Sequence, residues 1–494
     1  MPSAAGGEPN DKQLKAAKQL LRGPQEGVVR RGARSCLKQD NAPAADLLLE
    51  ALNRTQPHYR DIVWEVLPLL KDPYARKRVA YQARTNKKNP RVRQWCLQAL
   101  GLFGDPIHAK TLMGALTAKQ DYVRAAAVTS LGQLKHADAW KKLERAARDK
   151  SALVRARTIE ALARIDAERA KEWFGAALEE DDPQVRCFAL GSLTELYPAL
   201  IEERSIHALG DTDWRPRMQA VENLTTLRTK TSLDALVRAT DDVRPVVGRR
   251  AMTRLAELSG KRFSLPEQWR LWWDENRKEF EFPAPPDAKD ADGDGDADGD
   301  AKKKAGPSLG PGGDGKTRAA FEGLPVESDH VAFIIDKSTS MKGPAGNGAT
   351  KDDAARKALD ETLTAVSGRF VFNVFTFGGD PQGMSKEPVV LTDKTRKQAA
   401  AFVKGIDPGG RKNIWEILEL VVADPRIDTI YLLSSGEPEV GLYVHWNRVT
   451  EHLIALNRMQ RVTVHTVVWS ESKWYRDQLE KIADCTGGRF VARD

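Results

Sequence analysis

Three oxygen-bearing side chains stand at alternate positions in the stretch FIIDKSTSM, which spans residues 333–341. Asp336 directly follows an apolar run, and Ser338 and Ser340 come two and four residues later. A carboxylate and two hydroxyls are hard oxygen ligands of the kind that Mg²⁺ or Mn²⁺ prefers. The spacing therefore predicts a small turn able to bind a divalent cation, provided that other segments supply the remaining ligands.

The surrounding sequence indicates which elements would position this turn. From residue 329, short apolar runs alternate with amphipathic stretches. We expect strands at 331–336, 370–377, 429–435 and 462–469, and helices near 351–367, 394–405, 413–423, 444–458 and 472–485. This alternation predicts a doubly wound α/β domain with a parallel sheet covered on both faces. Ligands of such sheets bind beyond the carboxyl ends of the strands, where Asp336 falls.

Four blocks of this region resemble the signature segments of the von Willebrand factor A (VWA) domain. They read VAFIIDKSTSM, GGRKNIWEILEL, IYLLSSGEPEVG and LEKIADCTGGRFV, and the resemblance covers residues 328–494. It implies a Rossmann-like fold and a metal-ion-dependent adhesion site whose first loop reads D-x-S-x-S. Asp336, Ser338 and Ser340 match that loop residue by residue.

Two further ligands that the family would supply are replaced in this chain. Lys412 stands where the family's G-G-x-T-N loop has a threonine, and Ser435 stands where its L-T-D-G block has an aspartate. Loss of a carboxylate weakens the attraction for a dication, and a nearby ammonium repels it. We therefore predict a degenerate, metal-independent site without a cofactor, in which Lys412 pairs with Asp336. Bound Mg²⁺ or Mn²⁺ is the alternative.

The first half of the chain carries an internal repeat with a 31-residue step. One position of the repeat is usually arginine, and a leucine stands seven places after every such position except the first. The arginines are Arg31, Arg93, Arg124, Arg155, Arg186 and Arg217; Ile62 and Gly248 fill the other positions; the leucines are Leu69, Leu100, Leu131, Leu162, Leu193, Leu224 and Leu255. Apolar residues within a unit fall three and four apart, on one helical face, which neighbouring units must cover. The pattern predicts an α-solenoid.

The motif D-P-x-V-R-x-x-A within these units resembles HEAT repeats over residues 15–260, especially the short bacterial type first noted in phycobilisome lyases. The same solenoid serves lyases, DNA-repair enzymes and scaffolds, so the resemblance implies a fold more than an activity. In such arrays the repeated arginine usually pairs with an acid of the same or the next unit. Here Asp182 and Asp213 are candidates for that structural role.

Three segments are expected to lie outside these two modules. Residues 261–282 carry tryptophans at helical spacing, which predicts a helix that caps the end of the solenoid. Residues 283–327, rich in Pro, Gly, Asp and Lys, predict a disordered linker. Residues 1–14 are expected to form a disordered N-terminus.

Charge is unevenly distributed along the solenoid. Residues 1–160 contain 30 Lys and Arg against 15 Asp and Glu, a net charge of +15, whereas residues 161–282 contain 19 against 22, a net charge of −3. The basic excess makes nucleic acid or an acidic protein an alternative partner of the N-terminal repeats. No motif for reading bases accompanies the charge.

Other function classes find little support in the sequence. It contains no Ser-His-Asp or Cys-His arrangement, no phosphate-binding glycine loop and no histidine cluster. The cysteines are too widely spaced for a zinc or redox motif, and we expect all four to be buried; they are Cys36, Cys96, Cys187 and Cys485. Neither a membrane-spanning window nor a secretory signal is visible, so we expect a cytoplasmic location unless a signal has been removed.

These features together predict a non-enzymatic scaffold or adaptor that binds protein partners through a HEAT-like solenoid and a VWA domain. Joining two modules lets weak contacts at each reinforce the other. Three alternatives remain open: an enzyme like the HEAT-containing lyases or base-excision proteins, a nucleic-acid-binding protein, and a Mg²⁺-dependent adhesion module.

Overall fold

The computed structural model describes most of the chain, in four ranges: residues 11–54, 57–283, 319–345 and 348–493. The chain divides into two compact units, each formed by two stretches of sequence. The first comprises residues 1–196 and 438–449, and the second comprises residues 197–437 and 450–494.

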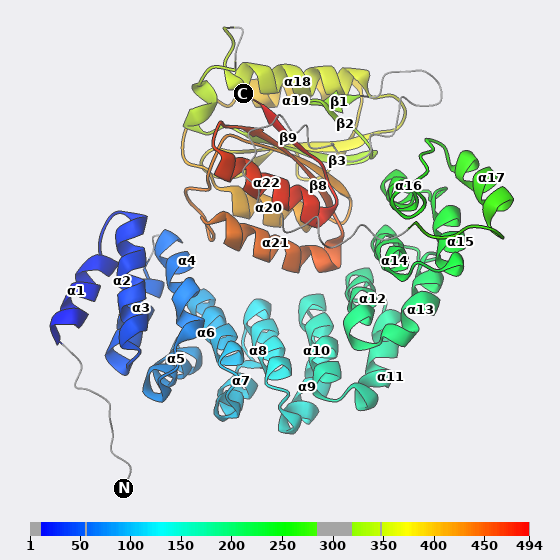
Figure 1. Cartoon of the computed structure of the whole chain (residues 1–494). Coiled ribbons are helices and arrows are strands. Elements are labelled where there is room, and N and C mark those ends of the chain that lie inside the picture. Colours follow the sequence, from blue (N-terminus) through cyan, green and yellow to red (C-terminus); the bar gives the residue numbers. More distant parts are fainter. Residues whose placement is uncertain (1–10, 55–56, 284–318, 346–347, 494) are drawn as a thin grey trace. The chain divides into compact units, whose positions relative to one another are not determined.

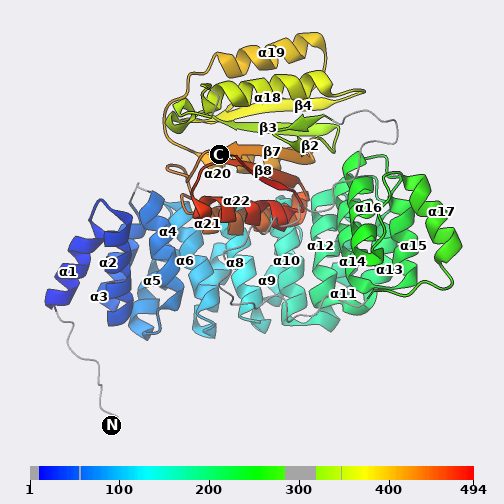
Figure 2. The ribbon, with the colours of Figure 1, turned by 45° about the horizontal axis from the view of Figure 1, so that its top comes forward.

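Antiparallel helices in two layers build most of the first unit (Figures 1 and 2). The even-numbered helices form one layer: α2 (Glu26–Gln39), α4 (Pro57–Val66), α6 (Pro90–Leu102), α8 (Asp121–Gln133), α10 (Ala152–Ile165) and α12 (Pro183–Leu196). The other layer contains α3 (Ala42–Leu52), α5 (Pro73–Thr85), α7 (Ala109–Ala115), α9 (Trp140–Ala146) and α11 (Ala167–Leu178). Helix α1 (Asp11–Leu21) packs on α2 and α3.

The helices begin and pack as their sequences dictate. Asp72 caps α5 by accepting a hydrogen bond from the N–H of Ala75 at 2.7 Å, and a proline occupies the first turn. Helices α8 and α10 approach closely at Gly132, where a Cβ would lie 2.8 Å from the Cα and Cβ of Ala161. A larger residue there would push neighbouring repeats apart.

The repeated arginines join one helical repeat to the next. Nη1 of Arg124 donates to the carbonyls of Ala118 (2.8 Å) and Lys119 (3.0 Å) at the end of the preceding helix. Its Nε and Nη2 each donate to Asp149 at 2.7 Å. Burial alone would raise the pKa of Asp149, but Arg124 and a backbone N–H lower it below its ordinary value. One guanidinium therefore satisfies a helix terminus and a partly buried acid.

The same arrangement recurs in other helical repeats. Arg155 pairs with Glu180 at 2.5 Å and more weakly with Asp182 at 3.4 Å. In the second unit, Arg217 pairs with Asp242 at 2.7 Å. The predicted pairing with an acid is thus present for Arg124, Arg155 and Arg217, with Asp182 as a secondary partner of Arg155.

Some expectations for the first unit were wrong. Helix α1 begins at Asp11, so residues 11–14 are helical, while residues 1–10 lie outside the described part of the chain. Leu69 is 56% exposed because α4 ends at Val66, before the predicted repeat position.

The segment 438–449 belongs to the first unit and packs on α4. The carboxylate of Asp61, only 2% exposed, accepts hydrogen bonds from the N–H groups of Val444 (2.9 Å) and His445 (3.1 Å). The guanidinium of Arg448 lies 4.9 Å from the ring centre of Trp64. Burial raises the pKa of Asp61, although the two N–H groups oppose this. A buried acid of the solenoid thus fixes the backbone that leads into α21 (Trp446–Gln460).

Five helices begin the second unit: α13 (Ile201–Ala208), α14 (Trp214–Leu227), α15 (Lys230–Ala239), α16 (Pro245–Ser259) and α17 (Pro266–Asn276). As predicted, α17 packs on α15 and α16 through its tryptophans. Trp269 and Trp273 are buried, and the Nε1 of Trp273 donates to Asp234 at 2.5 Å. Asp213 accepts from Arg215 at 2.8 Å, a partner that the sequence did not suggest.

A largely parallel sheet forms the rest of the second unit, with strand order β5-β4-β3-β7-β8-β9. The parallel strands are β3 (His330–Asp336), β4 (Val371–Phe377), β7 (Thr429–Ser434), β8 (Thr463–Trp469) and β9 (Phe490–Arg493). Two short strands, β5 (Gln382–Gly383) and β6 (Val389–Val390), pair antiparallel with β4. Helices α18 (Lys351–Ala365) and α19 (Asp393–Lys404) cover one face; α20 (Ile414–Val422) and α22 (Lys473–Thr486) cover the other (Figure 2). The predicted doubly wound arrangement is present.

The domain begins before the predicted boundary. Strands β1 (Ala320–Phe321) and β2 (Leu324–Pro325) form a hairpin that was assigned to the linker. Phe321 is fully buried, with its ring centre 5.1 Å from that of Phe333 and 5.9 Å from that of Tyr431. Residues 319–327 therefore belong to the domain, with Phe321 and Leu324 in its core, and residues 284–318 of the predicted linker lie outside the described residues.

Helix α16 contacts the sheet domain directly within the second unit. The Nε of Arg244 donates to the carboxylate of Asp428 at 2.6 Å, and Asp428 is fully buried. Arg250 donates to the carbonyls of Thr486 (3.2 Å) and Gly487 (2.9 Å) at the end of α22. These contacts, which the sequence did not predict, join the last repeats to the sheet without the linker.

The cysteine prediction was wrong at one position. Cys485, which we expected to be buried, lies on the exposed side of α22.

Replacing Arg124 with methionine should reduce the free energy of unfolding by about 3 kcal/mol or more, because it leaves a partly buried acid without its cation. The matched change Arg22→Met removes a pair with Glu50 whose side chains are 54% and 44% exposed. That variant should lose less than about 1 kcal/mol. Urea unfolding of the full chain followed by circular dichroism compares them, and equal losses would contradict the role given to Arg124.

Acid should destabilise the second unit through His465. Burial, with a smaller effect of Arg489 and Arg250, lowers the pKa of His465 to about 3. The unfolded chain, with a histidine pKa of about 6.5, binds more protons, so this contribution is complete above about pH 6.5 and is lost as pH falls toward 3.

His465→Gln retains an acceptor for the N–H of Arg489, which lies 3.1 Å from the His465 Nδ1, but cannot titrate. Between pH 6.5 and 4.5 its stability should fall less steeply than that of the wild type, by up to about 1.4 kcal/mol per pH unit. Urea titrations at several pH values measure the slopes. Parallel slopes would refute the assignment.

Candidate functional site at the carboxyl edge of the sheet

The loops that follow β3 and β4 meet the loop between α19 and α20, and their backbones are bonded to one another. Lys337, directly after β3, donates its N–H to the carbonyl of Phe377 and accepts from the N–H of Gly409, both at 2.7 Å. The N–H of Gly379 donates to the carbonyl of Arg411 at 2.9 Å. These bonds fix the loop that carries Asp336 against the loop that carries Lys412.

Glycine is required where the loops cross. Gly410 has a φ of +72°, which residues with a side chain rarely adopt. A Cβ on Gly410 would also lie 2.7 Å from the carbonyl oxygen of Gly378. The G-G pair of the sequence block thus permits a close backbone approach at this edge.

Asp336 lies at the centre of the site and is fully buried. Its Oδ1 accepts from the N–H of Ser338 at 2.8 Å. Its Oδ2 accepts from both the N–H (2.9 Å) and the hydroxyl (2.5 Å) of Ser435. Three donors therefore satisfy a carboxylate that would otherwise be costly to bury.

The serine hydroxyls extend this network to the surface. The Oγ of Ser340 lies 2.6 Å from the Oγ of Ser435 and 2.9 Å from that of Ser338. Ser340 is exposed, whereas Ser338 is buried. The site residues chosen from the sequence thus lie together in the structure. Their hydroxyls form a chain of hydrogen bonds that connects the buried carboxylate of Asp336 to solvent.

The predicted ion pair between Lys412 and Asp336 is not formed, although the structure describes both residues. The carboxylate is bonded to the two serines instead, because Ser435 is short enough to place its hydroxyl against Oδ2. Lys412 is 6% exposed and runs beside the loop that carries Ser435. A Cβ on Gly436 would lie 3.9 Å from its Nζ. Lys412 therefore lies next to the site without binding Asp336.

A different lysine, missed by the sequence analysis, forms the buried ion pair of this loop. Lys337 is 1% exposed, and its Nζ donates to Asp352 at 2.5 Å and to the carbonyl of Val403 at 3.0 Å. Alternation along an extended chain places residue 337 on the face opposite to 336 and 338. That alternation was the available signal, and it directs the ammonium toward α18 and α19.

The residues at this edge do not fit a divalent cation well. The donor set contains one carboxylate, whose oxygens already accept three hydrogen bonds, and neutral hydroxyls. A cation would have to compete with those hydrogen bonds for the oxygens of the only carboxylate in this donor set. The site is better suited to donating hydrogen bonds than to binding metal.

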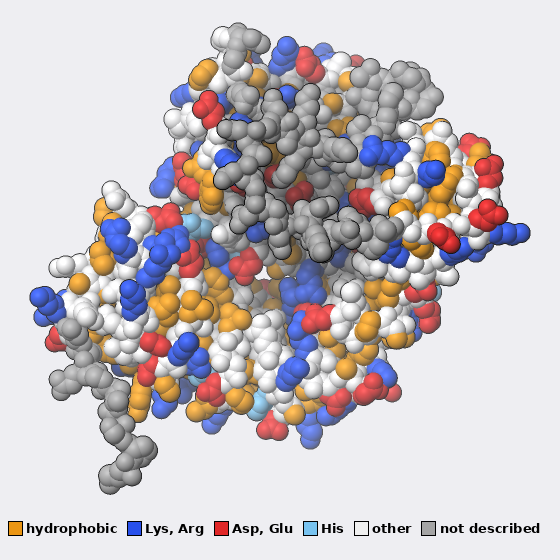
Figure 3. Space-filling model, in the orientation of Figure 1, with side chains coloured by type: hydrophobic (Ala, Val, Ile, Leu, Met, Phe, Trp, Pro, Cys, Tyr) orange, Lys and Arg blue, Asp and Glu red, His pale blue; other side chains and the backbone are white. Residues whose placement is uncertain are grey.

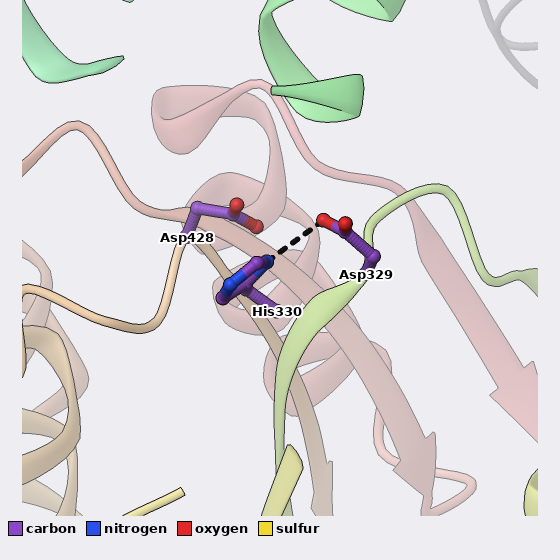
Figure 4. Close-up of side chains that lie close together, drawn as sticks. All are labelled: Asp329, His330 and Asp428. Carbon is purple, nitrogen blue, oxygen red and sulfur yellow. Dashed lines mark hydrogen bonds and ion pairs between the residues drawn. The ribbon is translucent and has the colours of Figure 1, made fainter. Parts of the chain in front are cut away.

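A second cluster of potential metal ligands lies at the opposite, amino end of the strands (Figure 4). Ligand atoms of Asp329, His330 and Asp428 lie within 4.8 Å of one another. Asp428 already accepts from Arg244 at 2.6 Å and from Ser328 at 2.5 Å. Burial raises its pKa, although Arg244 opposes this. The cluster is accounted for by the ion pair that connects α16 to the sheet.

Comparison with known families supports both parts of the chain. A family model for HEAT repeats matches residues 44–126, 78–163, 109–193 and 171–256. A model for the von Willebrand factor type A domain matches residues 329–491. These matches confirm the two resemblances seen in the sequence. None of the helices in the described ranges combines the length and hydropathy that a membrane span needs.

The individual relatives share only part of the chain. Inter-alpha-trypsin inhibitor heavy chain 4 of Mus musculus is 30% identical over 134 residues, which are 25% of this chain and 14% of that protein. Human von Willebrand factor A domain-containing protein 3B is 23% identical over 171 residues, 33% of this chain and 12% of that protein. The chain therefore spans about a seventh or less of these relatives.

Among solved structures, the phycocyanin lyase complex of Nostoc sp. is 19% identical, with 56% of this chain and 97% of that chain covered. The TM-score of 0.25 is too low for this likeness to bear on function.

The serine network itself can be tested by substitution. Ser435→Ala removes one of three hydrogen bonds to a fully buried carboxylate and should lower stability by about 1.5–3 kcal/mol. Ser340→Ala is the matched control, because Ser340 is exposed and does not contact Asp336; it should lose less than about 0.5 kcal/mol. Thermal unfolding of the full chain measures both, and equal losses would refute the central place of Ser435.

Proposed function

We propose that this chain, which consists of HEAT repeats followed by a VWA domain, is a non-enzymatic adaptor that binds protein partners and whose VWA site needs no divalent cation. The observation that carries the proposal is the bonding of Asp336 to Ser338 and Ser435. Hydrogen bonds within the protein satisfy the carboxylate around which the family's metal would be held.

The exposed rim of this site suits recognition by hydrogen bonding. Thr339 and Ser340 are exposed at the carboxyl edge of the sheet. These hydroxyls can donate hydrogen bonds to a carboxylate or another polar acceptor on the partner. Such a partner would bind to the protein directly, without a bridging ion.

An enzymatic role has weaker support at this site. The hydroxyls of Ser338, Ser340 and Ser435 bond to Asp336 or to one another, and no imidazole or thiol is among these bonded partners. A serine nucleophile usually needs an adjacent base to be activated. The arrangement therefore favours binding over covalent chemistry.

Metal independence predicts that the melting temperature of the full chain will differ by less than about 1 °C between Mg²⁺, Mn²⁺ and EDTA. A cation that bound only the folded state would stabilise it. The double variant Lys412→Thr, Ser435→Asp restores the family's ligand types and should gain a Mn²⁺-dependent increase of several degrees. Differential scanning calorimetry measures both.

A shift of several degrees on chelation of the wild type would overturn metal independence. The adaptor proposal has a separate test. The double variant Thr339→Arg, Ser340→Arg should lose the binding of partner proteins that the wild type still binds in EDTA, and quantitative affinity capture measures this binding. Retention of every partner by this rim variant would reject the site as a binding surface.

A further inference from the structure

The outer face of helix α5 combines exposed aromatic rings with cations. Buried alanines and a valine, Ala75, Val79 and Ala83, face the neighbouring helices. On the opposite side, Tyr74 is 67% exposed and Tyr81 is 52% exposed. Large aromatic side chains normally bury most of their surface, so two such rings on one helix face are notable candidates for ligand contact.

A cation accompanies each ring. The Nζ of Lys77 lies 5.1 Å from the ring centre of Tyr74, and the guanidinium carbon of Arg84 lies 5.7 Å from that of Tyr81. Neither tyrosine has an aromatic neighbour within the described part of the chain. One cation therefore lies over each ring, and no described aromatic side chain competes with a ligand for stacking on either ring.

The surrounding charge is strongly positive. Several exposed cations on or beside α5 make no ion pair with any described residue; they are Lys71, Lys77, Arg84, Lys87 and Lys88. Among the described residues, Arg78 forms an ion pair with Asp46 alone, at 3.3 Å, and both side chains are at least 50% exposed. An exposed pair of this kind is weak and easily exchanged for another anion. Figure 3 shows Lys and Arg side chains interspersed with Asp and Glu on the visible face.

The spacing of the rings sets the shape of a suitable ligand. Tyr74 and Tyr81 are seven residues apart, so they lie about 10 Å apart along one side of the helix. Lys77 and Arg78 occupy the same side between them. A linear polymer that carries a flat ring and a negative charge on each monomer would match this alternation of tyrosine and cation.

We propose that the outer face of α5, defined by Tyr74, Lys77, Arg78, Tyr81 and Arg84, binds single-stranded nucleic acid. Bases stack on the two tyrosines, and phosphates contact the cations. An acidic peptide would satisfy the cations but would leave the ring faces without a stacking partner. The proposal does not depend on the VWA site, which lies in the other unit.

Fluorescence anisotropy of the full chain with labelled U20 RNA and dT20 DNA tests this inference. At 50 mM NaCl both should bind, and Tyr74→Ala, Tyr81→Ala should weaken binding at least tenfold. Tyr74→Phe, Tyr81→Phe keeps the rings and should stay within about twofold of the wild type. Near-wild-type melting of the alanine variant establishes that it is folded, and the phenylalanine variant provides the comparison if it is not.

The salt dependence of the affinity and variants that remove charge distinguish binding at this face from nonspecific electrostatic attraction to the protein. Lys77→Gln, Arg84→Gln should flatten the plot of log affinity against log salt by about 1.4, because two phosphate contacts are lost. Lys141→Gln, Lys142→Gln removes the same charge from exposed positions on α9 and should leave affinity within about twofold.

No binding at 50 mM NaCl, or equal binding by the tyrosine-to-alanine variant, would overturn the proposal. A duplex or polyglutamate that competes as well as U20 would also overturn it, because neither presents free base faces.

Discussion

A buried carboxylate must be satisfied, and the way Asp336 is satisfied determines the character of the VWA site. Asp336 is fully buried at the end of the central strand and accepts three hydrogen bonds from serines. Unpaired, it would cost several kcal/mol. In this chain the donors lie within its own loops. Ser435, which stands where the family resemblance implies an aspartate, supplies two of the three hydrogen bonds.

Buried charges perform a similar task elsewhere, because each connects segments distant in the sequence. Arg124 and Asp149 connect successive repeats, Asp61 holds the backbone at residues 444 and 445, and Arg244 binds Asp428. Breaking one of these contacts leaves the partner buried without compensation, which makes them specific as well as stabilising.

The 31-residue repeat and the helical spacing within it made the solenoid predictable, and short apolar runs alternating with amphipathic stretches made the parallel sheet predictable. The site residues Asp336, Ser338, Ser340 and Ser435 were predictable because short motifs carry them. The pairings were not. That Lys337 binds Asp352 and that Lys412 does not bind Asp336 depend on the direction of each side chain and on the position of α18, which no local pattern encodes. The β1–β2 hairpin was also missed, because two-residue strands leave too little periodic signal beside a Gly- and Pro-rich segment.

The central claim is that hydrogen bonds from Ser338 and Ser435 satisfy the carboxylate of Asp336 in place of a cation. Crystals of the full chain grown with 10 mM MnCl₂, with diffraction recorded at the manganese absorption edge, test it most directly. The account predicts no anomalous peak beside Asp336 and a Ser435 hydroxyl within hydrogen-bonding distance of its carboxylate. A peak about 2.2 Å from a carboxylate oxygen of Asp336, with Ser435 turned away, would contradict it.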